Sequence, residues 1–129
     1  MKPIEILIEV NGAVEKAKIK IRRKDSIMMF EMADGTSRPY SNDDYFQSLG
    51  ELRADFPHIK FLCKGSKLNV YPSSMASQMA NGLVAYEVQI GMSADRDQIV
   101  HTFDYEDQDI CATIEEQREF RKQWMASFK

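Results

Sequence analysis

Alternation of apolar and polar side chains predicts that the chain opens with a β-hairpin. From residue 4 to residue 10 apolar residues occupy every second position, with one exception, which is the pattern of a half-buried strand. Asn11-Gly12 follows, and this dipeptide favours a type I′ turn because both of its central positions need positive φ. Continuing the pairing from the turn places Glu5 opposite Lys18 on the polar face.

Short apolar stretches bounded by turn residues predict further strands. They fall at residues 26–32, 58–65, 67–72, 83–91 and 98–105. Between them, and at the end of the chain, stand three helices, each preceded by a capping signal. The capping residues are, in chain order, Ser41 with Asp44, then Ser73 or Ser74, then Thr113 with Glu116. Pro57 ends the first helix.

This order of elements predicts an α+β fold. Hairpins dominate, and helices come between groups of strands, so we expect a mainly antiparallel sheet of about five to six strands with two to three helices packed on one face. A chain of 129 residues suits one hydrophobic core. We therefore expect a single domain over residues 1–129.

Composition favours an ordinary soluble chain in a reducing compartment. Apolar residues make up 43% and charged residues 29% of the chain. The N-terminus lacks the features of an export signal, and no apolar run is long enough for a transmembrane helix. The two cysteines are far apart and have no CxxC spacing. We therefore expect a cytoplasmic protein without disulfides and without membrane association.

Charge is unevenly distributed along the chain. Residues 15–24 are basic, which the polar side of the hairpin accounts for, and residues 104–119 are acidic, although the net charge is only −3. One interpretation is two solvated faces; the other is that the acidic end meets a basic partner. The candidate partner-binding residues are Asp104, Glu106, Asp107, Asp109, Glu115 and Glu116. Residues 105–113 are also where we expect the most flexible segment.

Candidate chemistry gathers at residues 63–82, but each residue there has a structural explanation. Cys63 occupies an alternate apolar position, where a thiol packs as a small core residue. Met75 and Met79 stand four apart, and we expect them to face the core; the alternative is an adaptable apolar contact surface. No metal-ligand spacing, phosphate-binding loop or nucleophile elbow is present. We expect no catalytic residue, no metal site and no cofactor.

The same stretch resembles the central motif of a family of small uncharacterised bacterial proteins. The matching positions are Cys63, Gly65, Ser66, Asn69, Val70, Tyr71, Pro72, Ser73, Met75, Met79, Gly82, Ala85 and Tyr86. That family resembles immunity proteins of toxin–immunity systems, including contact-dependent growth inhibition. The resemblance implies a protein that binds and neutralises a cognate toxin domain in the cytoplasm, and it brings no catalytic residues.

Three functions therefore stay open from the sequence. The first is the immunity function, with a basic toxin such as a nuclease domain as the partner that an acidic surface suits. The second is a small enzyme or ligand-binding protein with its site at the Cys63–Met79 loop. The third is a nucleic-acid-associated protein that uses the basic hairpin, although the negative net charge disfavours nucleic-acid binding.

Overall fold

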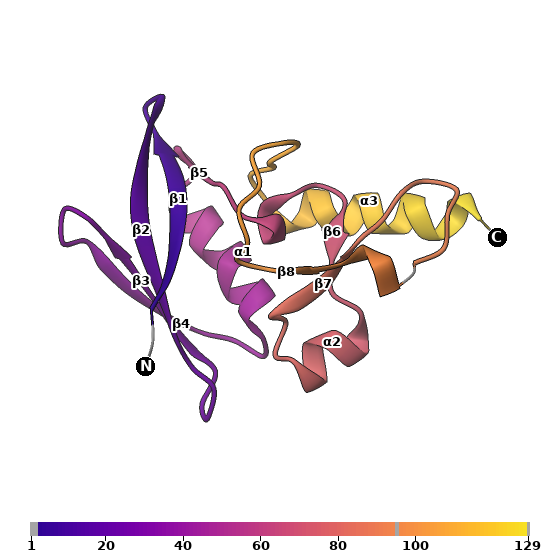
Figure 1. Ribbon diagram of the computed structural model, residues 1–129, viewed down its shortest axis with the longest axis horizontal. Coiled ribbons are helices and arrows are strands. Elements are labelled where there is room, and N and C mark those ends of the chain that lie inside the picture. The colour runs from indigo at the N-terminus through magenta and orange to yellow at the C-terminus, as the bar shows by residue number, and fades with distance from the viewer. Residues whose placement is uncertain (1–2, 95, 129) are drawn as a thin grey trace.

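The computed structural model describes residues 3–94 and 96–128 and has the predicted α+β architecture (Figure 1). The antiparallel strands divide between two sheets, of order β4-β3-β2-β1-β5 and β6-β7-β8. The strands are β1 (Ile4–Val10), β2 (Ala13–Arg22), β3 (Ile27–Met32), β4 (Ser37–Ser41), β5 (Ile59–Phe61), β6 (Val70–Tyr71), β7 (Val84–Glu87) and β8 (Ile99–His101). The helices are α1 (Tyr45–Asp55), α2 (Ser74–Met79) and α3 (Ile114–Ser127), with 3₁₀ turns η1 (Lys64–Ser66) and η2 (Arg96–Gln98).

The N-terminal hairpin has the predicted register. Val10 pairs with Ala13, and Glu5 lies opposite Lys18. Asn11 and Gly12 have φ values of 52° and 82°, as a type I′ turn requires. The apolar faces of β1 and β2 supply a large part of the hydrophobic core beneath the five-stranded sheet, here called the first core. The basic residues of β2 lie on the opposite, polar face of the hairpin.

The strand β4 was not predicted, and it corrects the position of the first helix cap. Ser41 is the last residue of β4 and does not cap α1. The cap is Asp44, whose carboxylate accepts a hydrogen bond from the backbone N–H of Gln47 at 2.8 Å. The sequence hides β4 because only Tyr40 of its five residues is buried, which leaves no alternation to detect.

Helix α1 lies between the two sheets and contributes to both cores (Figure 1). Its residues Tyr45, Leu49 and Leu52 pack into the core beneath the five-stranded sheet. Phe46 faces the other way and packs with Val70 in the second core. Each of these fully buried side chains contributes roughly 1.5–3 kcal/mol relative to an exposed position, so α1 joins the two halves of the molecule.

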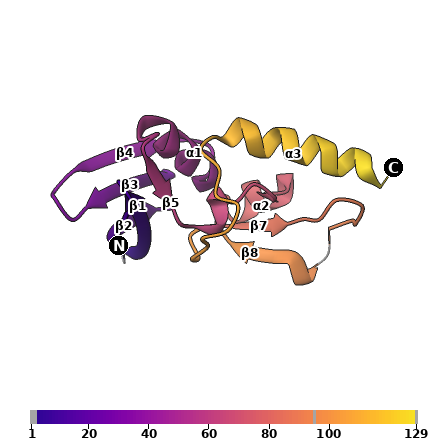
Figure 2. The same ribbon diagram turned by 90° about the horizontal axis from the view of Figure 1, so that it is seen from above.

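Helix α3 runs along the half of the molecule that holds β7 and β8 (Figure 2). It begins as predicted, because Thr113 accepts a hydrogen bond from the backbone N–H of Glu116. Within the part of the chain that the structure describes, no helix is long and apolar enough to cross a membrane.

Candidate functional site

The segment from Cys63 to Gly82, here called the signature segment, begins in the core. Cys63 is fully buried and packs among the residues of the first core. Burial raises the pKa of its thiol to about 12. A thiol needs deprotonation to act as a nucleophile, so this environment favours the structural role over the catalytic one.

Gly65 and Ser66 continue the segment through the turn η1. A Cβ atom at Gly65 would lie 2.6 Å from Cγ2 of Thr102 and 2.7 Å from Cδ2 of Leu49. Both distances are shorter than van der Waals contact allows. The Gly65 N–H also donates to the carbonyl of Thr102 at 2.8 Å, so glycine is required here for close packing of η1 beside β8.

Tyr71, Pro72 and Ser73 connect β6 to α2. Tyr71 pairs with Tyr86 of the neighbouring strand β7. Pro72 is buried, and Ser73 caps α2 by accepting a hydrogen bond from the Ala76 N–H at 3.0 Å. Of the two predicted capping serines, the structure therefore selects the first.

Met75 and Met79 correct the expectation that they face the core. Their side chains are 68% and 75% exposed. The i, i+4 spacing does place them on one face of α2, but α2 is a six-residue helix with no buried residue. Together with Val84 and Ile99 they line a shallow hollow, so they form an exposed apolar surface.

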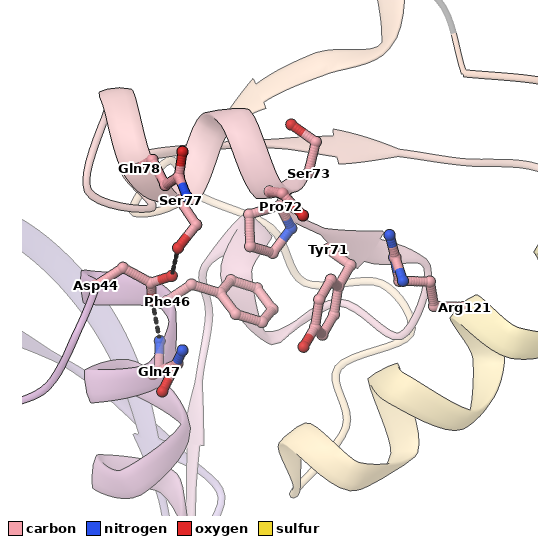
Figure 3. Close-up of a pocket in the computed structure, with 10 residues that line it drawn as sticks. Asp44, Phe46, Gln47, Tyr71, Pro72, Ser73, Ser77, Gln78 and Arg121 are labelled. Carbon is pink, nitrogen blue, oxygen red and sulfur yellow. Dashed lines mark hydrogen bonds between the residues drawn. The ribbon is translucent and has the colours of Figure 1, made fainter.

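A second hollow, of about 380 Å³, lies where the signature segment meets α1 and α3 (Figure 3). Asp44 lies at one end, where its carboxylate accepts hydrogen bonds from the Gln47 N–H and the Ser77 hydroxyl. Arg121 of α3 lies at the other end, over the ring of Tyr71. The charged groups at the two ends therefore have opposite sign.

The acidic segment, residues 104–119, presents most of its candidate residues to solvent. Five of the six are exposed: Asp104, Asp107, Asp109, Glu115 and Glu116. Glu106 differs, because it is only 8% exposed. It therefore presents no free charge to a partner.

Glu106 belongs to an ionic cluster that holds the acidic segment in place. Its Oε1 lies 2.9 Å from Nζ of Lys64 and 2.8 Å from Nζ of Lys67. Glu87 of β7 contacts the same two ammonium groups at 2.7 Å and 3.3 Å. Burial raises the pKa of Glu106, but hydrogen bonds from Lys67, the Gln108 N–H and Lys64 outweigh it and lower that pKa to about 2.

Backbone contacts fix residues 105–113 as well, which corrects the expectation of a flexible segment. Tyr105 bridges to Cys63, and Ile110 bridges to Lys67. The carbonyl of Asp109 accepts a hydrogen bond from the Leu68 N–H at 2.9 Å. The segment is irregular in shape, yet it is attached along its length to the signature segment.

A cleft of about 430 Å³ separates the acidic segment from the N-terminal hairpin and β5. Its charged lining consists of three carboxylates, from Glu9, Asp107 and Asp109, against the single ammonium of Lys60. Two exposed apolar side chains also line the cleft. They are Tyr105, which is 55% exposed, and the hairpin residue Val14, which is 56% exposed. The cleft therefore combines negative charge with apolar contact area.

The sequence did not reveal a buried polar pair that attaches α3. Arg53 is 2% and Gln117 1% exposed, and they share a hydrogen bond of 2.6 Å. The Gln117 amide donates to the carbonyls of Gly65, Lys67 and Val70. The available signal was the position of Arg53, which follows the buried Phe46 by two helical turns and therefore shares its face.

Compared with known proteins, the chain matches no protein-family model and no curated protein sequence. Among residues 3–94 and 96–128, no group of three or more histidine, cysteine, aspartate or glutamate side chains is placed to hold a metal ion.

Proposed function

We propose that this chain is an immunity-type protein that binds and neutralises a toxin domain in the cytoplasm through its acidic segment. The observation that carries the proposal is the cleft that Asp107 and Asp109 line together with the exposed side chains of Tyr105 and Val14. Binding sites between proteins concentrate their energy in aromatic and apolar contacts at the centre, and charge complementarity selects the partner.

The attachment of the acidic segment supports the proposal. Glu106, Lys64 and Lys67 hold the backbone that carries Asp107 and Asp109. A surface that is already ordered loses less conformational entropy when a partner binds. The exposed carboxylates therefore form a prepared surface, and its charge fits a basic toxin such as a nuclease domain, whose natural ligand is a polyanion.

The resemblance of the signature segment to the immunity-like family supports the same function from the sequence. Its residues Cys63 and Gly65 have structural roles, because Cys63 is buried in the core and Gly65 allows close packing of neighbouring segments. The segment anchors the acidic segment through Lys64 and Lys67. In the proposed function, the motif is the scaffold and the acidic segment is the contact surface.

Coexpression with the product of the gene immediately upstream, which the proposal expects to be the toxin, tests the proposal. The chain is expected to rescue growth and to copurify with the toxin domain. The variant Asp107→Asn/Asp109→Asn is expected to lose most of both effects. Asparagine tolerates the positive φ of 54° at Asp109, so the fold is retained.

The control variant is Asp43→Asn/Asp97→Asn, which removes two exposed carboxylates that lie outside the acidic segment and do not line the cleft. It has the same net charge as the test variant and is expected to rescue growth like the wild-type chain. Absence of copurification with wild-type protein would contradict the immunity function. Equal rescue by the two variants would contradict the assignment of the surface.

A further inference from the structure

Two hollows adjoin at Tyr71, on a part of the molecule that the acidic segment does not line. The first is the polar hollow of Figure 3. The second, of about 260 Å³, is lined mainly by apolar side chains, among them Tyr86 of β7 and Trp124 of α3. Both share the residues Tyr71, Pro72, Ser73 and Arg121. They form one groove, here called the Arg121 groove, that changes from polar to apolar along its length.

A guanidinium group stands where the two halves of the groove meet. The Arg121 guanidinium lies over the Tyr71 ring, 5.4 Å from its centroid. One turn earlier in α3, Arg118 donates a hydrogen bond from Nε to the Tyr71 hydroxyl at 3.3 Å. Within the described residues, Arg121 makes this cation–π contact and no ion pair. Its N–H groups are therefore available to an anion.

The apolar half of the groove is preformed. The indole of Trp124 donates a hydrogen bond to the carbonyl of Met92 at 2.7 Å. Phe128 packs edge-on against the same indole, with ring centroids 5.0 Å apart. Tyr86 is held by its position in β7 and faces the same hollow, as does the buried Val88. Aromatic walls that are already fixed need little reorganisation to receive an apolar ligand.

Asp44 restricts the charge of a ligand. Its carboxylate lies at the far end of the polar half, opposite Arg121 (Figure 3). A second negative group on the ligand would approach that carboxylate and be repelled, whereas a single one beside Arg121 would be attracted.

We propose that the Arg121 groove binds a small organic monoanion. Its aliphatic or aromatic body lies against Tyr86, Val88 and Trp124, and its single carboxylate or sulfonate faces Arg121. This binding site is separate from toxin binding, because the acidic cleft and the groove share no lining residue.

The probes are 8-anilinonaphthalene-1-sulfonate, which combines aromatic rings with one sulfonate, and octanoate as a competitor. Trp124 is the single tryptophan of the chain, so its intrinsic fluorescence reports directly on the groove. We expect saturable binding of the sulfonate probe, with a change in Trp124 emission, and displacement by octanoate. The uncharged 1-octanol is expected to displace the probe about tenfold more weakly, because it lacks the charge-assisted hydrogen bond.

Variants separate the groove from nonspecific apolar binding. Arg121→Gln is expected to weaken probe binding about tenfold, whereas Arg121→Lys, which keeps the charge, retains part of it. Lys122→Gln removes the neighbouring exposed charge, which lines neither hollow, and is expected to bind like wild type. Thermal unfolding of each variant confirms that it is folded.

The proposal is overturned if the wild-type chain shows no saturable change in Trp124 emission, or if folded Arg121→Gln binds the probe with wild-type affinity. Rescue from the toxin by Arg121→Gln is expected to be unchanged. Failure of the groove and failure of the immunity function are therefore separate outcomes.

Discussion

The carboxylate of Glu106 accepts a hydrogen bond from the ammonium of Lys67 at 2.8 Å, and this contact joins the acidic segment to the signature segment. The first of these segments carries the proposed binding surface, and the second carries the motif that the sequence singles out. In the proposed function the signature segment needs no contact with the partner, because its role is to hold the acidic segment that makes that contact.

Replacement of Glu106 tests that attachment. Glu106→Gln is expected to lower the free energy of unfolding by roughly 1.5–3 kcal/mol, the range for hydrogen bonds to charged groups. The loss is limited because Lys64 and Lys67 retain Glu87 as a partner. Urea unfolding measures it. Asp107→Asn removes an exposed carboxylate next in the chain and is expected to change stability by less than about 0.5 kcal/mol; an equal effect of the two variants would contradict the role of the cluster.

The same carboxylate predicts how stability depends on pH. The pKa of Glu106 is about 2 in the folded chain, against an ordinary value of 4.5. A lowered pKa means that the stabilisation is complete above pH 4.5 and is lost as the pH falls from 4.5 towards 2. Thermal unfolding of the wild type is therefore expected to shift more over this interval than that of Glu106→Gln. Parallel pH profiles for the two proteins would refute the assignment.

Gly65→Ala tests the close packing of η1 beside β8. The new Cβ would clash with Cγ2 of Thr102 at 2.6 Å, and overpacking of this kind costs roughly 1–3 kcal/mol. The melting temperature is expected to fall accordingly. Adding Thr102→Ser removes the clashing methyl group but keeps the hydroxyl that donates to the Gly82 carbonyl. This second change is expected to recover part of the lost melting temperature. No recovery would show that the new Cβ clashes with an atom other than the Thr102 methyl group.

Thiol reactivity distinguishes the structural role of Cys63 from a catalytic one. Burial raises the pKa of Cys63 to about 12 and also raises that of Cys111, despite the opposing charge of Arg53. In a Cys111→Ser variant we expect no reaction of the native protein with an aromatic disulfide reagent at pH 8. One thiol should appear on unfolding in denaturant. Rapid labelling of native Cys63 would instead favour the alternative of an enzyme at the Cys63–Met79 loop.

Local patterns in the sequence were enough to predict several elements. The hairpin register followed from alternation and the Asn11-Gly12 turn, both of which act over a few residues. The cap at Thr113, and a cap at Ser73 or Ser74, followed from side chains that bond to backbone N–H groups three residues away. Such features depend little on the rest of the chain.

Other features depended on contacts between distant segments and were not predicted. Exposure of Met75 and Met79 depends on what covers α2, and their spacing carries no information about that. Burial of Glu106 depends on Lys64 and Lys67, about forty positions earlier in the chain. Composition therefore identified the acidic segment as a candidate surface, but only the structure separates its anchoring carboxylate from its exposed ones.

The most direct test of the central claim is the association rate of the purified chain with the toxin domain that coexpression is expected to identify, measured at low and high salt. If Asp107 and Asp109 steer a basic partner, the wild-type rate falls steeply as salt increases. For Asp107→Asn/Asp109→Asn the rate is expected to be several-fold lower at low salt and less sensitive to salt. Identical rates and salt dependence for the two proteins would contradict the proposed binding surface.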